Sequence, residues 1–479
     1  MNLINGLYGD HLKQIQRINK NYELYEGKQE WSTNADLDYE PTKKVTNYIK
    51  KLIDTKARFM FGKEPFLDVR AIEPDDRGST VYQDQAQEKE DLLHVILRNN
   101  KFHSKLLKGM KDCLIGGKVA IKLWANKDKG LKLIFSPAQE FFPVYNIDDV
   151  DELERVMFLY GIKTEGPSKE QRFKKQVWEL INGKCILNEG IFDGSGKLIE
   201  AIEIDYDTKL DFIPVVIVQN GGLTGETEGN SDVETLWSNQ NAYNRLTSDD
   251  MDALRFNMFP QRVATDANEQ TLDNMRIAPG ALIDLQTDEV QSNYGLQAKL
   301  EVVESNFAYE GKYTDTINRT KNDMFDLLDI PNVSLDQLKG LMASGKSMKA
   351  LYWGLVNVCE EHATEWEPAL KQMVYFIFNM VDTYNLYDSR KIGRYETDLS
   401  IIRTYPIAED VLDEKRMDLE EVLNETRSKR SYIDKWGVSE DVDSELEQIQ
   451  LEKSMLDIDN YTKDLISDVD EEGDEEDEV

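Results

Sequence analysis

Residues 340–347, GLMASGKS, form the most specific chemical pattern in the chain. They match the P-loop pattern, in which backbone N–H groups and a lysine bind the phosphates of a nucleotide. A P-loop follows a buried parallel strand, but residues 331–339 are polar and turn-like. No apolar strand ending in Asp or Glu follows, because residues 374–382 continue a helical pattern. This context favours a basic loop that opens a helix, and a nucleotide-binding enzyme stays as an alternative.

Carboxylates, cysteines and histidines are the other candidates for chemistry. Adjacent pairs such as Asp249-Asp250 and Glu360-Glu361 could serve a metal-dependent nuclease, but neighbours on a helix do not converge on one point. Residues 468–473 resemble the start of a calcium loop without its closing glutamate. The 3 cysteines form no CxxC pair, and the 4 histidines show no metal-ligand spacing. We therefore predict no metal, no cofactor and no catalytic residue, which means that the chain is not an enzyme.

The formal net charge of −34 restricts how the chain can meet nucleic acid. A protein that grips DNA through its phosphates normally presents a basic face, so binding over the whole surface is excluded. The basic run 163–175 has no ladder of aromatic residues and is typical of an exposed face. An acidic wall that surrounds DNA and repels its phosphates fits this charge, and so does a surface that only confers solubility.

Length and hydropathy bound the organisation of the chain. A chain of 479 residues predicts two to four structural units. The longest apolar stretches, 212–218 and 374–381, are too short to cross a bilayer, and the N-terminus has no apolar signal segment. We therefore expect no membrane partner and no secretion, and the unpaired cysteines suit a reducing cytoplasm.

The first half reads as α+β. Helical periodicity covers the first 60 residues in two runs and then residues 84–114. Residues 118–137 alternate like a hairpin that turns at 126–130. Four further strands, with a turn at Asp193–Gly196, are expected at 156–163, 176–180, 184–187 and 198–205.

The second half is dominated by long helices. Ser231 to Glu234, SDVE, predict a capping box that opens a half-polar helix of about 40 Å, which Pro260 ends. Such a helix suits a wall shared between subunits. Short strands over 261–303 precede a helix over 304–328. A second long helix is expected over 347–384, kinked at Pro368. The charged residues 408–462 are helical in pattern, and the acidic end of the chain is expected to be disordered.

Several segments in this order resemble the portal proteins of tailed phages that infect Gram-positive bacteria. Residues 47–65 are similar to the N-terminal signature of that family, and 117–124 to the hairpin that follows it. NSDVE at 230–234, with NAYN at 241–244 and Ser248-Asp249, is similar to the start of the first stem helix. Ser344-Gly345, followed by Lys349, corresponds to the Ser-Gly before the long helix of the family, which accounts for the P-loop pattern.

The resemblance implies a portal fold of class α+β, in which wing, stem and crown are mainly helical and the wing and clip carry small β-rich elements. Such subunits form a dodecameric ring around a DNA tunnel. The implied regions are a wing over 1–230, stem helix 1 over 231–260, a clip over 261–303, stem helix 2 over 304–331, a tunnel loop over 332–346, a long kinked helix over 347–386, a crown over 387–466 and an acidic disordered tail over 467–479.

The resemblance also implies site residues. Ser231, Glu234, Tyr243 and Asn244 would be stem residues. The tunnel loop would contact DNA through a second set of residues, namely Lys339, Met342, Ser344, Lys346 and Lys349. Because the loop also carries Leu338 and Leu341, contact through lysines and contact through apolar side chains both stay open.

The implied partners are other copies of the chain, double-stranded DNA, the terminase large subunit, the major capsid and scaffolding proteins, and the head-tail adaptor. The implied location is the portal vertex of the virion, after assembly in the host cytoplasm. Two alternatives remain at this point. One is the nucleotide-binding enzyme that rests on residues 340–347, and the other is a capsid or scaffold-type interaction protein without a channel.

Overall fold

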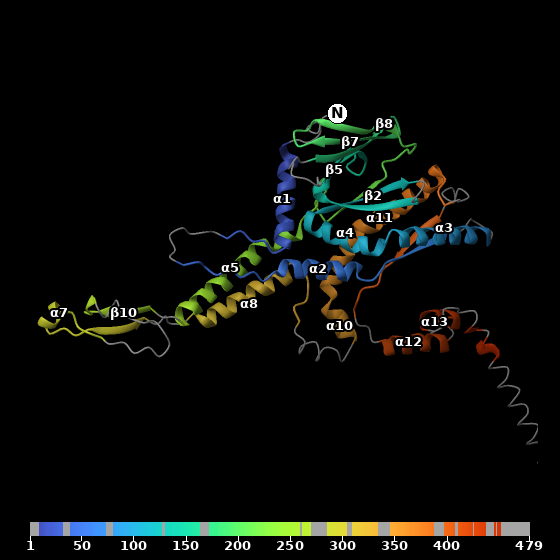
Figure 1. Ribbon diagram of the computed structural model, residues 1–479. Helices are drawn as coiled ribbons and strands as arrows, with labels where there is room; N and C mark the ends of the chain where they lie inside the picture. Colours follow the sequence, from blue (N-terminus) through green and yellow to red (C-terminus); the bar gives the residue numbers. More distant parts are fainter. Residues whose placement is uncertain are drawn as a thin grey trace, which may run out of the picture. The chain divides into compact units, whose positions relative to one another are not determined.

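The computed structural model is a mixed α+β structure, which confirms the expected fold class (Figure 1). The chain divides into two compact units, Met1–Val333 with Tyr352–Pro406, and Ser334–Leu351 with Ile407–Val479. The residues that the structure describes are 9–31, 39–72, 80–126, 130–162, 172–258, 261–269, 285–303, 309–333, 345–387, 397–407, 411–424, 426–436, 445–446 and 448–451.

Two N-terminal helices, α1 (Gly9–Tyr25) and α2 (Tyr48–Phe61), confirm the first two helical runs. The single helix expected over 84–114 was wrong, because this stretch forms α3 (Thr80–Asn99) and α4 (Phe102–Gly116). Lys101 between them has a φ of 51°. The side chain of Asn100 explains the break. Its amide bonds the carbonyl of Leu131 at 2.9 Å, and its oxygen accepts from the Leu133 N–H at 2.9 Å.

A three-stranded antiparallel sheet in the order β3-β2-β9 forms the centre of the first unit. It comprises β2 (Lys118–Asn126), β3 (Gly130–Pro137) and β9 (Val215–Gln219). The predicted hairpin is confirmed, since Val119 pairs with Pro137 and Asn126 with Gly130. Helix α4 packs against β2 and β3, and the long helix α11 (Trp353–Tyr384) packs against β9 and β2. The apolar core of this unit lies at these contacts.

A five-stranded antiparallel meander follows, and it confirms the four predicted strands. The single helical turn η1 (Ala138–Glu140) leads into it. Asn182 and Gly183 both have positive φ in the turn between its third and fourth strands, as a tight hairpin turn requires. The meander makes the wing range richer in strands than the small β elements that the sequence suggested. Its strands are β4 (Phe141–Tyr145), β5 (Leu153–Ile162), β6 (Arg172–Ile181), β7 (Lys184–Asp193) and β8 (Leu198–Asp207).

The pattern of helix, small insert and helix is present after residue 230. Helices α5 (Asp232–Met258) and α8 (Glu310–Asp326) pack side by side (Figure 1). The described part of the insert between them contains an antiparallel pair and one short helix, namely β10 (Gln261–Thr265), α7 (Glu289–Asn293) and β11 (Lys299–Val303).

The long helix expected over 347–384 is interrupted at Tyr352, which separates α10 (Gly345–Leu351) from α11. The backbone of Tyr352 has φ −91° and ψ 7°, and its ring stacks on Phe59 with centroids 5.7 Å apart. Pro368 lies inside α11, and the helix continues through it although the ring removes one backbone N–H donor. The kink at Pro368 stays a prediction.

Beyond α11, β12 (Thr397–Ile402) pairs antiparallel with β1 (Phe66–Ala71). The sequence did not predict this pairing. The second unit contains α12 (Val411–Leu423) and α13 (Lys429–Trp436). Asp418 joins these two helices, because its carboxylate accepts from Lys435 at 2.9 Å and from the Trp436 indole at 2.6 Å. The acidic tail lies outside the described residues.

Gly117 and Gly229 approach each other backbone to backbone where α4, β2 and the start of α5 meet. Gly117 has a φ of 83°, and its carbonyl accepts from the Asn220 N–H at 2.8 Å. A Cβ on either glycine would lie less than 3.0 Å from the other's carbonyl oxygen. Only glycine therefore fits at this crossing.

Replacing Gly117 with Ala should lower the free energy of unfolding by about 2–4 kcal/mol, because overpacking adds to the cost of a positive φ. Urea denaturation measures this. Gly183→Ala is the matched control, since Gly183 has a φ of 73° but open space around it, and it should cost only about 1–2 kcal/mol. Equal losses in the two variants would contradict the close approach.

Candidate functional site

The first turn of α5 is anchored by buried polar contacts. The Ser231 hydroxyl donates to the Ile115 carbonyl at 2.6 Å. The Asp232 carboxylate accepts from Lys56 Nζ at 2.8 Å and from Asn220 Nδ2 at 3.1 Å. The side chains of Lys56 and Asp232 are only 5% and 11% exposed. A carboxylate at a helix N-terminus also interacts favourably with the helix dipole, so this buried pair fixes where α5 begins.

The helix start is confirmed, but the predicted capping box was wrong. Glu234 accepts from Asn21 Nδ2 at 2.9 Å and forms an ion pair with Arg17 at 3.2 Å. Both partners belong to α1. The side chains that would close a box within α5 are therefore used to bind α1 and the end of α4, because these elements offer charged and carbonyl partners at short range.

A polar ladder forms between α5 and the extended segment 42–48. Four buried α5 side chains, four residues apart, accept hydrogen bonds from the backbone N–H groups of alternate residues in that segment. The pairs are Tyr48 to Gln240 at 2.8 Å, Thr46 to Asn244 at 3.0 Å, Lys44 to Ser248 at 3.0 Å and Thr42 to Asp252 at 3.0 Å. In return, Gln240 Nε2 donates to the Thr46 carbonyl at 2.8 Å.

The ladder works because two periods match. Four helical residues rise about 6.0 Å, and two extended residues advance about 6.6 Å. Residues 42–46 therefore run antiparallel to α5 without losing register, and Tyr48, the first residue of α2, makes the last contact of the ladder. The backbone groups of an isolated extended segment need partners, and α5 supplies them from its side chains.

The two remaining residues that were expected in the stem lie at the same contact. Tyr243 packs edge-on against Tyr48, with ring centroids 5.1 Å apart. Burial and the hydrogen bond to Tyr243 raise the pKa of Tyr48 to about 12. Asn244 Nδ2 also donates to Gln29 Oε1 at 2.6 Å. The structure thus brings Ser231, Glu234, Tyr243 and Asn244 together along one supported helix.

The tunnel-loop residues are only partly described. Lys339, Met342 and Ser344 lie outside the described residues. Lys346 lies in α10, and Lys349 is exposed on the same helix. Of the five predicted residues, the structure therefore places only Lys346 and Lys349, both in α10.

The residues around the P-loop pattern are likewise only partly described. Residues 327–333 form a turn and irregular chain after α8, and α10 begins at Gly345. Residues 334–344 lie outside the described part of the chain. Among the described residues, no group of three or more His, Cys, Asp or Glu side chains could hold a metal ion, and no helix is long and apolar enough to span a membrane.

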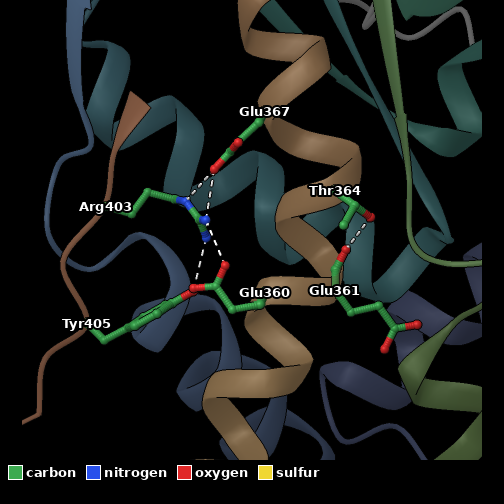
Figure 2. Close-up of polar contacts among 6 residues, drawn as sticks. All are labelled: Glu360, Glu361, Thr364, Glu367, Arg403 and Tyr405. Carbon is green, nitrogen blue, oxygen red and sulfur yellow. Dashed lines mark hydrogen bonds and ion pairs between the residues drawn. The ribbon is translucent and has the colours of Figure 1, made fainter. Parts of the chain in front are cut away.

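Arg403 holds the chain after β12 to α11 (Figure 2). Its guanidinium forms ion pairs with Glu360 at 3.0 Å and Glu367 at 2.8 Å, and it donates to the Tyr405 hydroxyl at 3.0 Å. The Tyr405 hydroxyl in turn donates to Glu360 at 2.7 Å. Burial opposes both shifts, but hydrogen bonding to Glu360 and the nearby negative charges raise the pKa of Arg403, and hydrogen bonds from Tyr405 and Arg403 lower the pKa of Glu360. Glu360 thus belongs to a structural clamp and not to a nuclease site with Glu361.

Sequence reasoning missed Gln240, Ser248 and Asp252. The signal was present, since these residues and Asn244 recur every fourth position on one face of α5. A polar stripe at that spacing is usually read as a solvated face. Only the segment packed against it shows that the stripe is buried.

Replacing Ser248 with Ala should lower the free energy of unfolding by about 1 kcal/mol, because the Lys44 N–H loses its acceptor. Amide hydrogen exchange at Lys44 should become faster. Ser238→Ala is the matched control, because Ser238 is exposed on the same helix. Since alanine is the better helix former, this control should retain or slightly gain stability. Similar losses in both variants would count against the ladder.

Comparison with known protein families gives a match over most of the chain. A family model described as "Phage portal protein, SPP1 Gp6-like" matches residues 5–458. No curated protein matched the sequence. The family match covers nearly all of the 479 residues, including α5, its supports and the insert. The chain therefore belongs to the SPP1 Gp6-like family of phage portal proteins, structural proteins that form the ring-shaped channel for DNA packaging at the capsid vertex.

Proposed function

We propose that this chain forms a homo-dodecameric ring that docks the terminase large subunit during packaging and later the head-tail adaptor. The major capsid and scaffolding proteins surround the ring, which assembles in the host cytoplasm. In this proposal the subunit performs no catalysis itself. Residues 1–230 act as the wing, 261–303 as the clip, 332–346 as the tunnel loop and 387–466 as the crown.

The observation that carries this proposal is that α5 is held on one face and exposes apolar side chains in its C-terminal half. One face is tied to the rest of the subunit by the ladder, which fixes the direction of the helix. Met251, Leu254, Phe256 and Met258 in its C-terminal half are exposed. Apolar side chains gathered on an exposed helix mark contact surfaces, and neighbouring copies in a ring would cover them.

Negative-stain microscopy of the purified full chain should therefore show rings with a central hole. Covering the exposed apolar residues of α5 supplies the driving force for assembly. Mass photometry of the same sample gives the subunit number, which is expected to be twelve. A stable monomer at micromolar concentration would contradict the proposal.

The lysines near the tunnel loop are proposed to guide DNA. Lys339, Lys346 and Lys349 are close in sequence, and Lys349 is exposed on α10. In a closed ring, each lysine becomes a circle of positive charge. Such circles attract phosphate weakly, while the acidic remainder of the chain repels it, so the duplex can slide.

Lys346→Glu should leave rings intact and lower DNA packaging in a reconstituted motor assay, because the constriction would then repel the duplex. Lys63→Glu is the control, since Lys63 is exposed in the first unit and the charge change is the same. Unchanged packaging with Lys339, Lys346 and Lys349 all replaced by Glu would disprove the contact. Calorimetry with ATP tests the alternative of a nucleotide-binding enzyme. Specific ATP binding that is lost in Lys346→Ala would favour that alternative.

A further inference from the structure

A groove of about 1000 Å³ lies beside α11 in the first unit, apart from the stem contacts. One face of α11 between Val358 and Gln372 forms one wall. The glycine-rich loop 220–226 and the ends of the neighbouring strands form the rest. The DNA channel and the ladder do not account for it.

The mouth of the groove is acidic. Asp151, Glu226, Glu361 and Glu365 all line it. Among the described lining residues, Lys56 is the only lysine or arginine, and its ammonium already pairs with Asp232. These four carboxylates therefore have no cation of their own within the groove.

Helix α11 carries two pairs of glutamates that differ in whether they have a cationic partner. Glu360 and Glu367 enclose the Arg403 guanidinium, whereas Glu361 points away from that clamp (Figure 2). Glu361 and Glu365 are four residues apart and therefore neighbours on the groove face. In the described part of the chain they have no ion-pair partner, so the groove offers the same carboxylate chemistry as the clamp without the cation.

Two buried polar side chains that line the groove each have one atom without a hydrogen-bond partner in the described part of the chain. Asn220 is 4% exposed. Its Nδ2 donates to the Asn230 carbonyl and to the Asp232 carboxylate, but its Oδ1 accepts no hydrogen bond. His362 is 9% exposed, and its Nε2 has no partner. Burial and the nearby Lys56 ammonium lower the pKa of His362 to about 4, so the ring is neutral near pH 7 and can accept a hydrogen bond.

We propose that this groove receives a lysine or arginine side chain from a second copy of the chain, so that adjacent subunits are joined by ion pairs to Glu361 and Glu365. The inference rests on the proposed ring. A lining of carboxylates and unused acceptors matches a cation with several N–H donors, and a guanidinium matches it best. The chain itself carries a basic run at 163–175, of which Lys174 already pairs with Glu189 and Lys175 is buried. Its peptides are the first to search in the experiment.

The test uses rings assembled from the full chain alone, with a photoreactive p-benzoylphenylalanine in place of Glu361. Subunits labelled with ¹⁴N and ¹⁵N are mixed before assembly, so that cross-links between copies carry both isotopes. After irradiation, mass spectrometry should find mixed-isotope links to a lysine- or arginine-containing peptide. The same probe at Glu88, an exposed position on α3, should give no link to that peptide.

A second variant keeps the shape of the groove. Glu361→Gln with Glu365→Gln should raise the subunit concentration at half-assembly about tenfold, because two interfacial ion pairs are lost. Asp84→Asn with Glu88→Gln, an exposed acidic pair at the same spacing on α3, should leave it unchanged. If the double Gln variant assembled at the wild-type concentration and cross-links formed only within one copy, the docking would be disproved, while the proposed ring would still stand. Wild-type protein that forms no rings would overturn the proposed function itself.

Discussion

The position of α5 depends on a match between two backbone periods. A helix that repeats every four residues and an extended chain that repeats every two advance by nearly the same distance. Side chains of α5 can therefore satisfy one N–H after another along residues 42–48. Buried polar groups are costly unless each finds its partner, so the ladder admits one register. Helix α5 consequently has a defined direction before any neighbouring subunit is present.

The ladder also explains how a half-polar helix can be part of a stable subunit. The N-terminal half of α5 buries Val233 and Leu236, while its C-terminal half exposes Leu254 and Met258. The most deeply buried apolar side chains of α5 therefore lie at one end of the helix. Hydrogen bonds to the segment 42–48 hold the remainder and leave the apolar side chains free to meet other copies.

Charge is arranged locally in a strongly acidic chain. Where the subunit must hold its own parts together, carboxylates have cations, as at Asp232 with Lys56 and Glu360 with Arg403. Along the groove beside α11, Asp151, Glu226, Glu361 and Glu365 have no cation in the described part of the chain. A net charge of −34 is thus compatible with a precise fold, because the uncompensated charge lies on surfaces that face solvent or partners.

The sequence by itself determined the fold class and the order of most elements, because periodicity and turn residues act locally, and its ordered motifs indicated the family. The hairpin over 118–137 and the helix that begins at 231 are examples. Tertiary structure alone decided three features. Asn100 ends a helix because strand β3 offers it partners, Ser231 and Glu234 bond α4 and α1 instead of each other, and the polar stripe of α5 is buried. Each depends on a group that lies far away in sequence, and local propensity carries no information about such a partner.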